Sequence, residues 1–135
     1  MSEINFIACN DELEELRNYS KNVITKKSFN NICYPSISLV KSEDYKEYNI
    51  KKKYVYSLDY RWQRESVEVL LDYFDRNMKK TDEIEFWSIW LNNRDDYSDL
   101  YKKKVLIQQL GYEYLDQFYE NEKDVKCLQI RNAFY

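Results

Sequence analysis

The chain has 135 residues, of which 33% are charged and 17% are aromatic, and its formal net charge is −3. This length suits a single domain with a real core, and 14 tyrosines are far too many for a disordered acidic tail. Histidine is absent and glycine occurs once, so the composition excludes imidazole-based catalysis and the glycine-rich loops that cradle phosphates. The same absence removes the commonest protein ligand of zinc, copper and iron.

Alternating apolar and polar residues predict a first strand over residues 1–9. Asn10 or Asp11 can cap a following helix that runs to about residue 23, with acidic residues in its first turn, where the helix dipole favours them. Its apolar residues recur at helical spacing. A short strand is then predicted over residues 36–40.

The middle of the chain contains the clearest amphipathic pattern. Residues 41–53 are polar and charged, which predicts a loop or a ragged helix, and residues 54–60 alternate as a half-buried strand does. Residues 63–78 follow the i, i+3, i+4 rhythm of a helix with one buried stripe. The predicted stripe comprises Val67, Leu70, Leu71, Phe74 and Met78.

Residues 84–91 are apolar on both faces, which predicts a central strand covered on both sides or one whose outer face meets a partner. Residues 92–96 are typical of a turn. Ser98 can cap a helix with apolar residues at helical spacing as far as Phe118, and Gly111 either ends that helix or interrupts it. Residues 125–131 are the predicted last strand.

These elements predict an α+β fold for a single domain spanning residues 1–135. The expected architecture is a mostly antiparallel sheet packed by two to four helices, and the alternative is an all-α fold. The predicted order of elements contains no crossover pattern that would force a parallel sheet.

The three cysteines, Cys9, Cys33 and Cys127, are too far apart for a C-x-x-C metal or redox pair. We expect reduced, mostly buried thiols in a cytoplasmic protein. We also expect no signal peptide, because residues 1–9 lack a basic leader and acidic residues begin at Asp11. No stretch approaches the ~18–20 apolar residues of a membrane span. The sequence therefore predicts no metal, no cofactor and no membrane contact.

The most distinctive feature is an acidic–aromatic block, residues 82–99. Its six acidic residues and one arginine give a local charge of −5, with four large aromatic side chains among them. Aromatic side chains supply contact area and carboxylates attract a cationic partner, so the block is a candidate docking surface. Alternatively, Trp87 and Trp90 belong to the core and the acids solvate the strand ends. The predicted partner-binding residues are Asp82, Glu83, Glu85, Trp87, Trp90, Arg94, Asp95, Asp96, Tyr97 and Asp99.

Two further patterns carry less weight. The carboxylate pairs in this block can in principle do acid–base work, but no oxyanion donor or pocket signature accompanies them, so we predict no catalytic residue. The basic runs 51–53 and 102–104 can in principle bind single-stranded nucleic acid. They are short and offset by acids in a chain of pI about 5.1, which favours solvated loop and helix faces and no nucleic-acid partner.

The overall profile resembles the immunity proteins encoded beside bacterial polymorphic and contact-dependent growth-inhibition toxins, most clearly at residues 83–91 and 94–97. Those proteins are small, single-domain, cytosolic, often acidic and catalytically inert, and they share no common fold. The resemblance implies a tight one-to-one complex with a cognate toxin domain, often a nuclease with a basic active-site surface. It also implies a monomer or weak dimer when free. The alternative is a phage-type inhibitor or adaptor that acts on a host nucleic-acid-binding protein through an acidic surface.

Overall fold

A single mixed sheet organises the molecule. The computed structural model describes residues 2–19, 37–43, 45, 48–91 and 100–133, and within them seven strands pair in the order β2-β3-β4-β1-β5-β7-β6. All neighbours are antiparallel except β6 and β7, which run parallel. The strands are β1 (Ser2–Cys9), β2 (Leu16–Tyr19), β3 (Ile37–Lys41), β4 (Tyr54–Asp59), β5 (Glu83–Leu91), β6 (Leu100–Leu106) and β7 (Val125–Arg131). The predicted α+β class with a mostly antiparallel sheet is confirmed.

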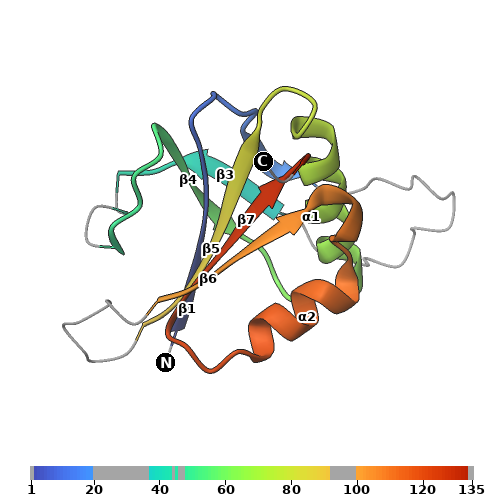
Figure 1. Ribbon diagram of the computed structural model, residues 1–135. Coiled ribbons are helices and arrows are strands. Elements are labelled where there is room, and N and C mark those ends of the chain that lie inside the picture. Colours follow the sequence, from blue (N-terminus) through green and yellow to red (C-terminus); the bar gives the residue numbers. More distant parts are fainter. Residues whose placement is uncertain (1, 20–36, 44, 46–47, 92–99, 134–135) are drawn as a thin grey trace, which may run out of the picture.

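Two helices, α1 (Arg64–Asn77) and α2 (Tyr112–Glu120), lie on the same side of the sheet (Figure 1). A short 3-10 turn, η3 (Ile107–Gln109), leads from β6 into α2. We call the face covered by the helices the helix face and the opposite one the second face. No helix in the described part of the chain is long and apolar enough to cross a membrane.

The larger core lies between the sheet and the two helices. Phe86 of β5 is at its centre, with its ring 5.8 Å from Phe74 of α1 and 5.8 Å from Phe118 of α2. In the predicted stripe on α1, four residues are at most 2% exposed and Leu71 is partly buried. The predicted helix over residues 63–78 is confirmed, since Gln63 and Met78 are its N-cap and C-cap.

A smaller core covers part of the second face. Phe6 of β1 and Trp87 of β5 lie there, under Tyr48 and Ile50 from the connection between β3 and β4. The Phe6 and Tyr48 rings are 5.9 Å apart. β5 is therefore buried on both faces, which confirms the prediction of a central strand covered on both sides. The predicted thiol burial is confirmed at Cys9 and Cys127, while Cys33 lies outside the described residues.

The helix predicted to follow residue 11 is wrong. Residues 12–15 have no regular structure, and Leu16–Tyr19 is strand β2, paired with β3. Leu13 and Leu16 are both buried, and their spacing of three fits a helix equally well. Tertiary contacts decide between the two: the Tyr56 hydroxyl accepts a hydrogen bond from Leu13 N (2.8 Å) and donates one to Leu13 O (3.1 Å). The remainder of that predicted helix, residues 20–23, lies outside the described residues.

The helix predicted from Ser98 to Phe118 is wrong before Gly111 and confirmed after it, where Tyr112–Glu120 is α2. Leu100–Leu106 is strand β6, which pairs with β7. Its Tyr101 and Val105 side chains both pack into the larger core on the helix face. The intervening α2 makes β6-α2-β7 a strand–helix–strand crossover, the arrangement that parallel pairing requires. The predicted capping residue and the predicted turn at residues 92–96 lie outside the described residues.

Gly111 begins a helix, whereas the sequence indicated that it ended or interrupted one. It is the N-cap of α2, with φ −156° and ψ −179°, and its carbonyl accepts a hydrogen bond from Leu115 N at 3.1 Å. This extended backbone is open to any residue. A Cβ added at Gly111 would meet nothing within 4 Å.

Gly111→Ser is therefore expected to stabilise the protein by about 0.5 kcal/mol, because a serine hydroxyl can accept a hydrogen bond from the first turn of α2. The side chain also restricts the unfolded chain. Urea unfolding measures the effect, with Gly111→Ala as the control that lacks the hydroxyl. A serine variant no more stable than the alanine variant would show that the cap bond does not form.

Candidate functional site

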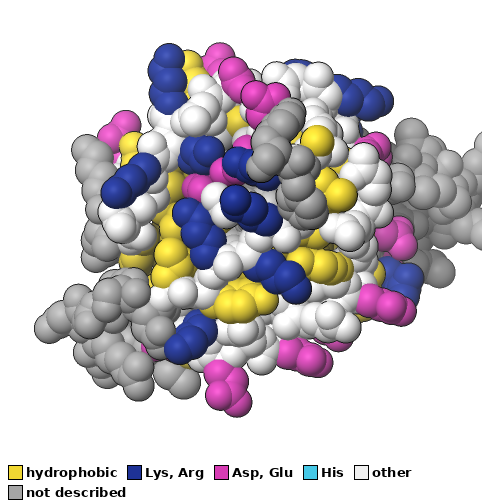
Figure 2. Space-filling view, in the orientation of Figure 1, with side chains coloured by type: hydrophobic (Ala, Val, Ile, Leu, Met, Phe, Trp, Pro, Cys, Tyr) yellow, Lys and Arg dark blue, Asp and Glu magenta, His cyan; other side chains and the backbone are white. Residues whose placement is uncertain are grey.

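A charged groove of about 630 Å³ lies on the second face, over β5, β7 and β6 and beside the connection from β3 to β4. Its charged lining residues are Lys51, Lys52, Glu83, Glu85, Lys102 and Arg131. Figure 2 shows several Lys and Arg side chains close together over the sheet, with acidic side chains among them. The groove therefore combines two of the six carboxylates of the acidic–aromatic block, those of Glu83 and Glu85, with cations from other parts of the chain.

The alternation of β5 brings these groups together. Residues 83, 85 and 87 point to the same face because successive strand side chains alternate. The antiparallel register with β7 places Glu83 opposite Arg131 and Glu85 opposite Gln129. In the same ladder Trp87 lies opposite Cys127 and is 3% exposed, packed in the smaller core.

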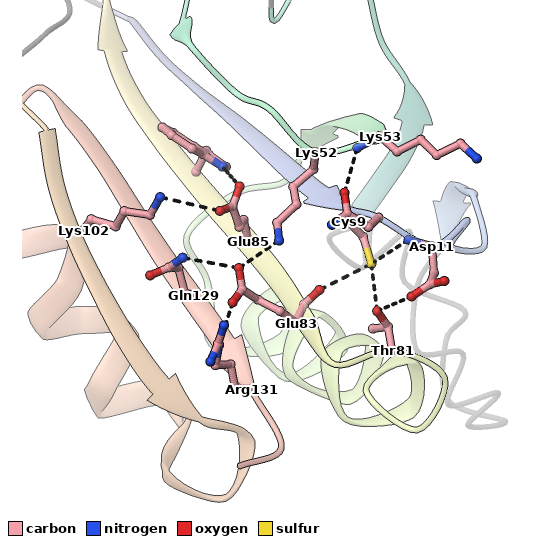
Figure 3. A network of polar contacts seen from close by, with 12 residues as sticks. Cys9, Asp11, Lys52, Lys53, Thr81, Glu83, Glu85, Lys102, Gln129 and Arg131 are labelled. Atoms are coloured by element: carbon pink, nitrogen blue, oxygen red, sulfur yellow. Dashed lines mark hydrogen bonds and ion pairs between the residues drawn. The ribbon is translucent and has the colours of Figure 1, made fainter. Parts of the chain in front are cut away.

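Glu83 is the most heavily bonded side chain of the groove. Its carboxylate accepts hydrogen bonds from Arg131 Nε at 2.6 Å and from Gln129 Nε2 at 3.3 Å, and Lys52 Nζ lies 3.0 Å from it. Figure 3 draws these three contacts. Burial opposes ionisation of Glu83, but the hydrogen bonds and charges of Lys52 and Arg131 outweigh it and hold the pKa of this carboxyl below its ordinary value. Glu83 is therefore an ionised counterion at neutral pH, not a proton donor.

Glu85 is bonded more loosely. The indole of Trp87 donates Nε1–H to Glu85 Oε1 at 3.0 Å, and Lys102 Nζ lies 3.8 Å from Glu85 Oε2. The Lys102 side chain is 43% exposed, so its charge remains available at the rim of the groove. Lys51 is also exposed.

The balance of charge makes the groove receptive to anions. Four cations and two carboxylates give the lining a formal net charge of +2, in a chain whose total is −3. Two of the cations, Lys52 and Arg131, are held in place by Glu83. A negatively charged group that enters the groove would therefore meet cations already oriented by the fold.

The structure separates the predicted partner-binding residues. Glu83, Glu85 and Trp87 are buried, so they form no exposed acidic–aromatic surface. All three line the groove, and their contact with a partner there remains a prediction. Asp82 is exposed just before β5, and Trp90 is 36% exposed at the opposite end of that strand. The other predicted residues lie outside the described part of the chain: Arg94, Asp95, Asp96, Tyr97 and Asp99.

Sequence reasoning missed the cations of the groove. Lys51, Lys52 and Lys102 fall in the two basic runs that the sequence predicts to be solvated faces, and Arg131 falls at the end of the predicted last strand. The usable signal was the alternation in β7, which puts Gln129 and Arg131 on one face. The contribution of β6 could not be seen while that segment was interpreted as a helix.

Other chemistry near the groove is limited. Burial, reinforced by the nearby Glu85 charge, raises the pKa of the Cys127 thiol, which therefore stays protonated. Within the described residues, no group of three or more Cys, Asp or Glu side chains is arranged to hold a metal ion. Comparison of the chain with protein-family models, with curated proteins and with solved structures finds no match.

Proposed function

We propose that this chain is an immunity protein that neutralises a cognate protein toxin by binding it, and that the charged groove receives acidic side chains of that toxin. The observation that carries the proposal is the +2 charge of the groove lining in a chain of net charge −3. The resemblance of the sequence to immunity proteins supplies the class of partner.

The construction of the groove supports binding over proton transfer. Its floor is formed by hydrogen-bonded strands, and Glu83 is occupied by three donors, so it has no proton to give at neutral pH. Cations fixed in this way lose little conformational entropy on meeting an anionic partner. Leu100, 40% exposed at the groove, offers apolar contact beside the charges.

The groove favours an acidic surface on the toxin, whereas the acidic–aromatic block of the sequence favours a basic one. Glu83 is neutralised inside the groove by Lys52 and Arg131, Glu85 has only the looser pair with Lys102, and Lys51 is exposed at the rim. A nuclease that holds divalent metals with carboxylates presents an acidic surface of the kind that fits. Occupation of such carboxylates by lysine side chains would block the toxin by competition with its metal.

A paired capture experiment tests the proposal. Lys51→Gln with Lys102→Gln removes two positive charges from the groove, and Lys79→Gln with Lys80→Gln removes two from exposed positions after α1. We expect the wild type and the Lys79/Lys80 variant to capture the same protein, and the groove variant to bind it about tenfold or more weakly, chiefly through a slower on-rate.

The captured protein must then behave as a toxin. We expect its expression alone to arrest growth of the producing bacterium, and co-expression with the wild-type chain to restore growth. A captured protein that is harmless when expressed alone would contradict the immunity function. Equal binding by the groove variant and the control variant would show instead that another surface meets the partner.

A further inference from the structure

A second hollow, of about 360 Å³, lies on the helix face, away from the charged groove. It is lined by Glu3 and Asn5 of β1, by Tyr60 and Trp62 from the connection between β4 and α1, and by Tyr119 of α2. Three of its five lining residues are aromatic and one is a carboxylate. We call it the aromatic pocket.

The rings of the aromatic pocket hold one another in place. Trp62 stacks on Tyr112 with ring centroids 5.1 Å apart, and it meets Tyr119 edge-on at 4.9 Å. The Tyr60 and Tyr119 hydroxyls are hydrogen-bonded to each other, and Tyr119 donates to Asn5 Oδ1 at 3.2 Å. The pocket is therefore formed before any ligand arrives.

Two neighbouring rings already carry cations from this chain. The guanidinium of Arg64 lies 4.9 Å from the centroid of Tyr112, and the ammonium of Lys126 lies 5.5 Å from that of Tyr119. Trp62 lies between these two tyrosines and is 38% exposed, and no cation of the described residues lies over its ring. Since tryptophan binds cations more strongly than tyrosine does, the best ring of the three is the one left open to solvent.

Glu3 adds the matching charge. Its side chain is exposed at the pocket and has no ion-pair contact within 4.0 Å among the described residues, although its charge also acts on Lys126, the cation over Tyr119. Its charge contributes to raising the pKa of both Tyr60 and Tyr119, for which burial is the main cause, so the carboxylate lies close to both rings. Trp90 lies directly opposite Glu3 in the β1–β5 ladder and is 36% exposed, which extends the aromatic surface beside the carboxylate.

We propose that the aromatic pocket binds an arginine side chain of a partner protein, with the guanidinium stacked on Trp62 and paired with Glu3. A planar guanidinium stacks on a ring while its N–H groups engage a carboxylate, whereas an ammonium is a compact and more strongly hydrated charge. This site attracts the opposite charge to the groove and lies on the opposite face of the sheet. It stands whether or not the groove binds a toxin.

The test uses model compounds and the whole chain. The indole N–H signal of Trp62, assigned by its loss in Trp62→Phe, is followed by NMR during titration with N-acetyl-arginine methylamide. We expect a saturable shift with a millimolar dissociation constant, since one cation–aromatic contact with one exposed ion pair is weak. The neutral citrulline analogue and the lysine analogue are each expected to bind about threefold or more weakly.

A charge variant separates Glu3 from general electrostatics. Glu3→Gln is expected to weaken binding of the arginine compound about threefold to tenfold, and Glu68→Gln, which removes an exposed carboxylate from α1, is expected to leave it unchanged. Equal affinity for the arginine and citrulline compounds, or no saturable shift of Trp62, would overturn the proposal. Equal affinity for the lysine compound would overturn the assignment to arginine.

Discussion

Phe74→Ala is expected to lower the free energy of unfolding by about 3–5 kcal/mol. The Phe74 side chain is 0% exposed and packs edge-on against both Tyr73 and Phe86. Truncation leaves a cavity between α1 and the central strand, and the surrounding rings are fixed by one another, so the site has little freedom to collapse. For a chain of this length the loss corresponds to a melting temperature lower by roughly 10–20 °C.

Urea unfolding of Phe74→Ala beside Asp75→Ala measures this effect. Asp75 is the next residue of the same helix and is exposed, so its replacement by alanine is expected to change stability by less than about 0.5 kcal/mol. A Phe74 variant as stable as the Asp75 variant would mean that α1 does not present this face to the core.

Glu83→Gln is expected to destabilise the protein by about 2–3 kcal/mol at neutral pH, because it removes the negative charge that forms ion pairs with Lys52 and Arg131. The Glu83 side chain is 8% exposed, whereas those of Lys52 and Arg131 are 19% and 24% exposed. The two cations therefore keep partial hydration after the change, which limits the loss. Glu68→Gln, on the exposed side of α1, is the matched control and should have little effect.

The effect of Glu83→Gln should depend on pH. The folded state holds the pKa of Glu83 below its ordinary value of 4.5, so the carboxylate stabilises the fold above that pH. The contribution is lost as the pH falls through the lower, folded-state pKa. Unfolding measured from pH 7 downward should show a constant difference between wild type and variant until about pH 4.5, and a shrinking one below it. A difference that persists unchanged in acid would assign the effect to packing.

Local periodicity predicted the elements whose pattern matched a single structure. Alternation along the chain identified β1 and β4, and the long amphipathic stripe identified α1 almost to the residue. β5 was recognised because both of its faces are apolar, and β7 was predicted with its observed bounds. In each case the side chains within the segment are enough to indicate which of its faces are buried.

Helix was predicted wrongly for two segments whose pattern fits either structure, residues 16–19 and residues 100–106. Leu13 and Leu16 are spaced for a helix, yet Leu16 pairs with Leu39 of β3. Leu100 and Ile107 began a helical series, yet Leu100–Leu106 pairs in parallel with β7. Edge strands such as these owe their structure to one neighbouring strand. That neighbour is distant along the chain, so no local window contains the deciding contact.

The sequence by itself predicted the α+β class and a central strand over residues 84–91, and it placed Glu83 and Glu85 in the acidic–aromatic block. Only the tertiary structure decided what surrounds them. Strand register set Arg131 opposite Glu83, and the connection after β3 added Lys52. A block with a local charge of −5 in the sequence thus contributes its two buried carboxylates to a groove of charge +2. The charge of a sequence block is a sum over residues that are neighbours along the chain. The electrostatic field at a surface is a sum over residues that are neighbours in space, wherever they lie in the sequence.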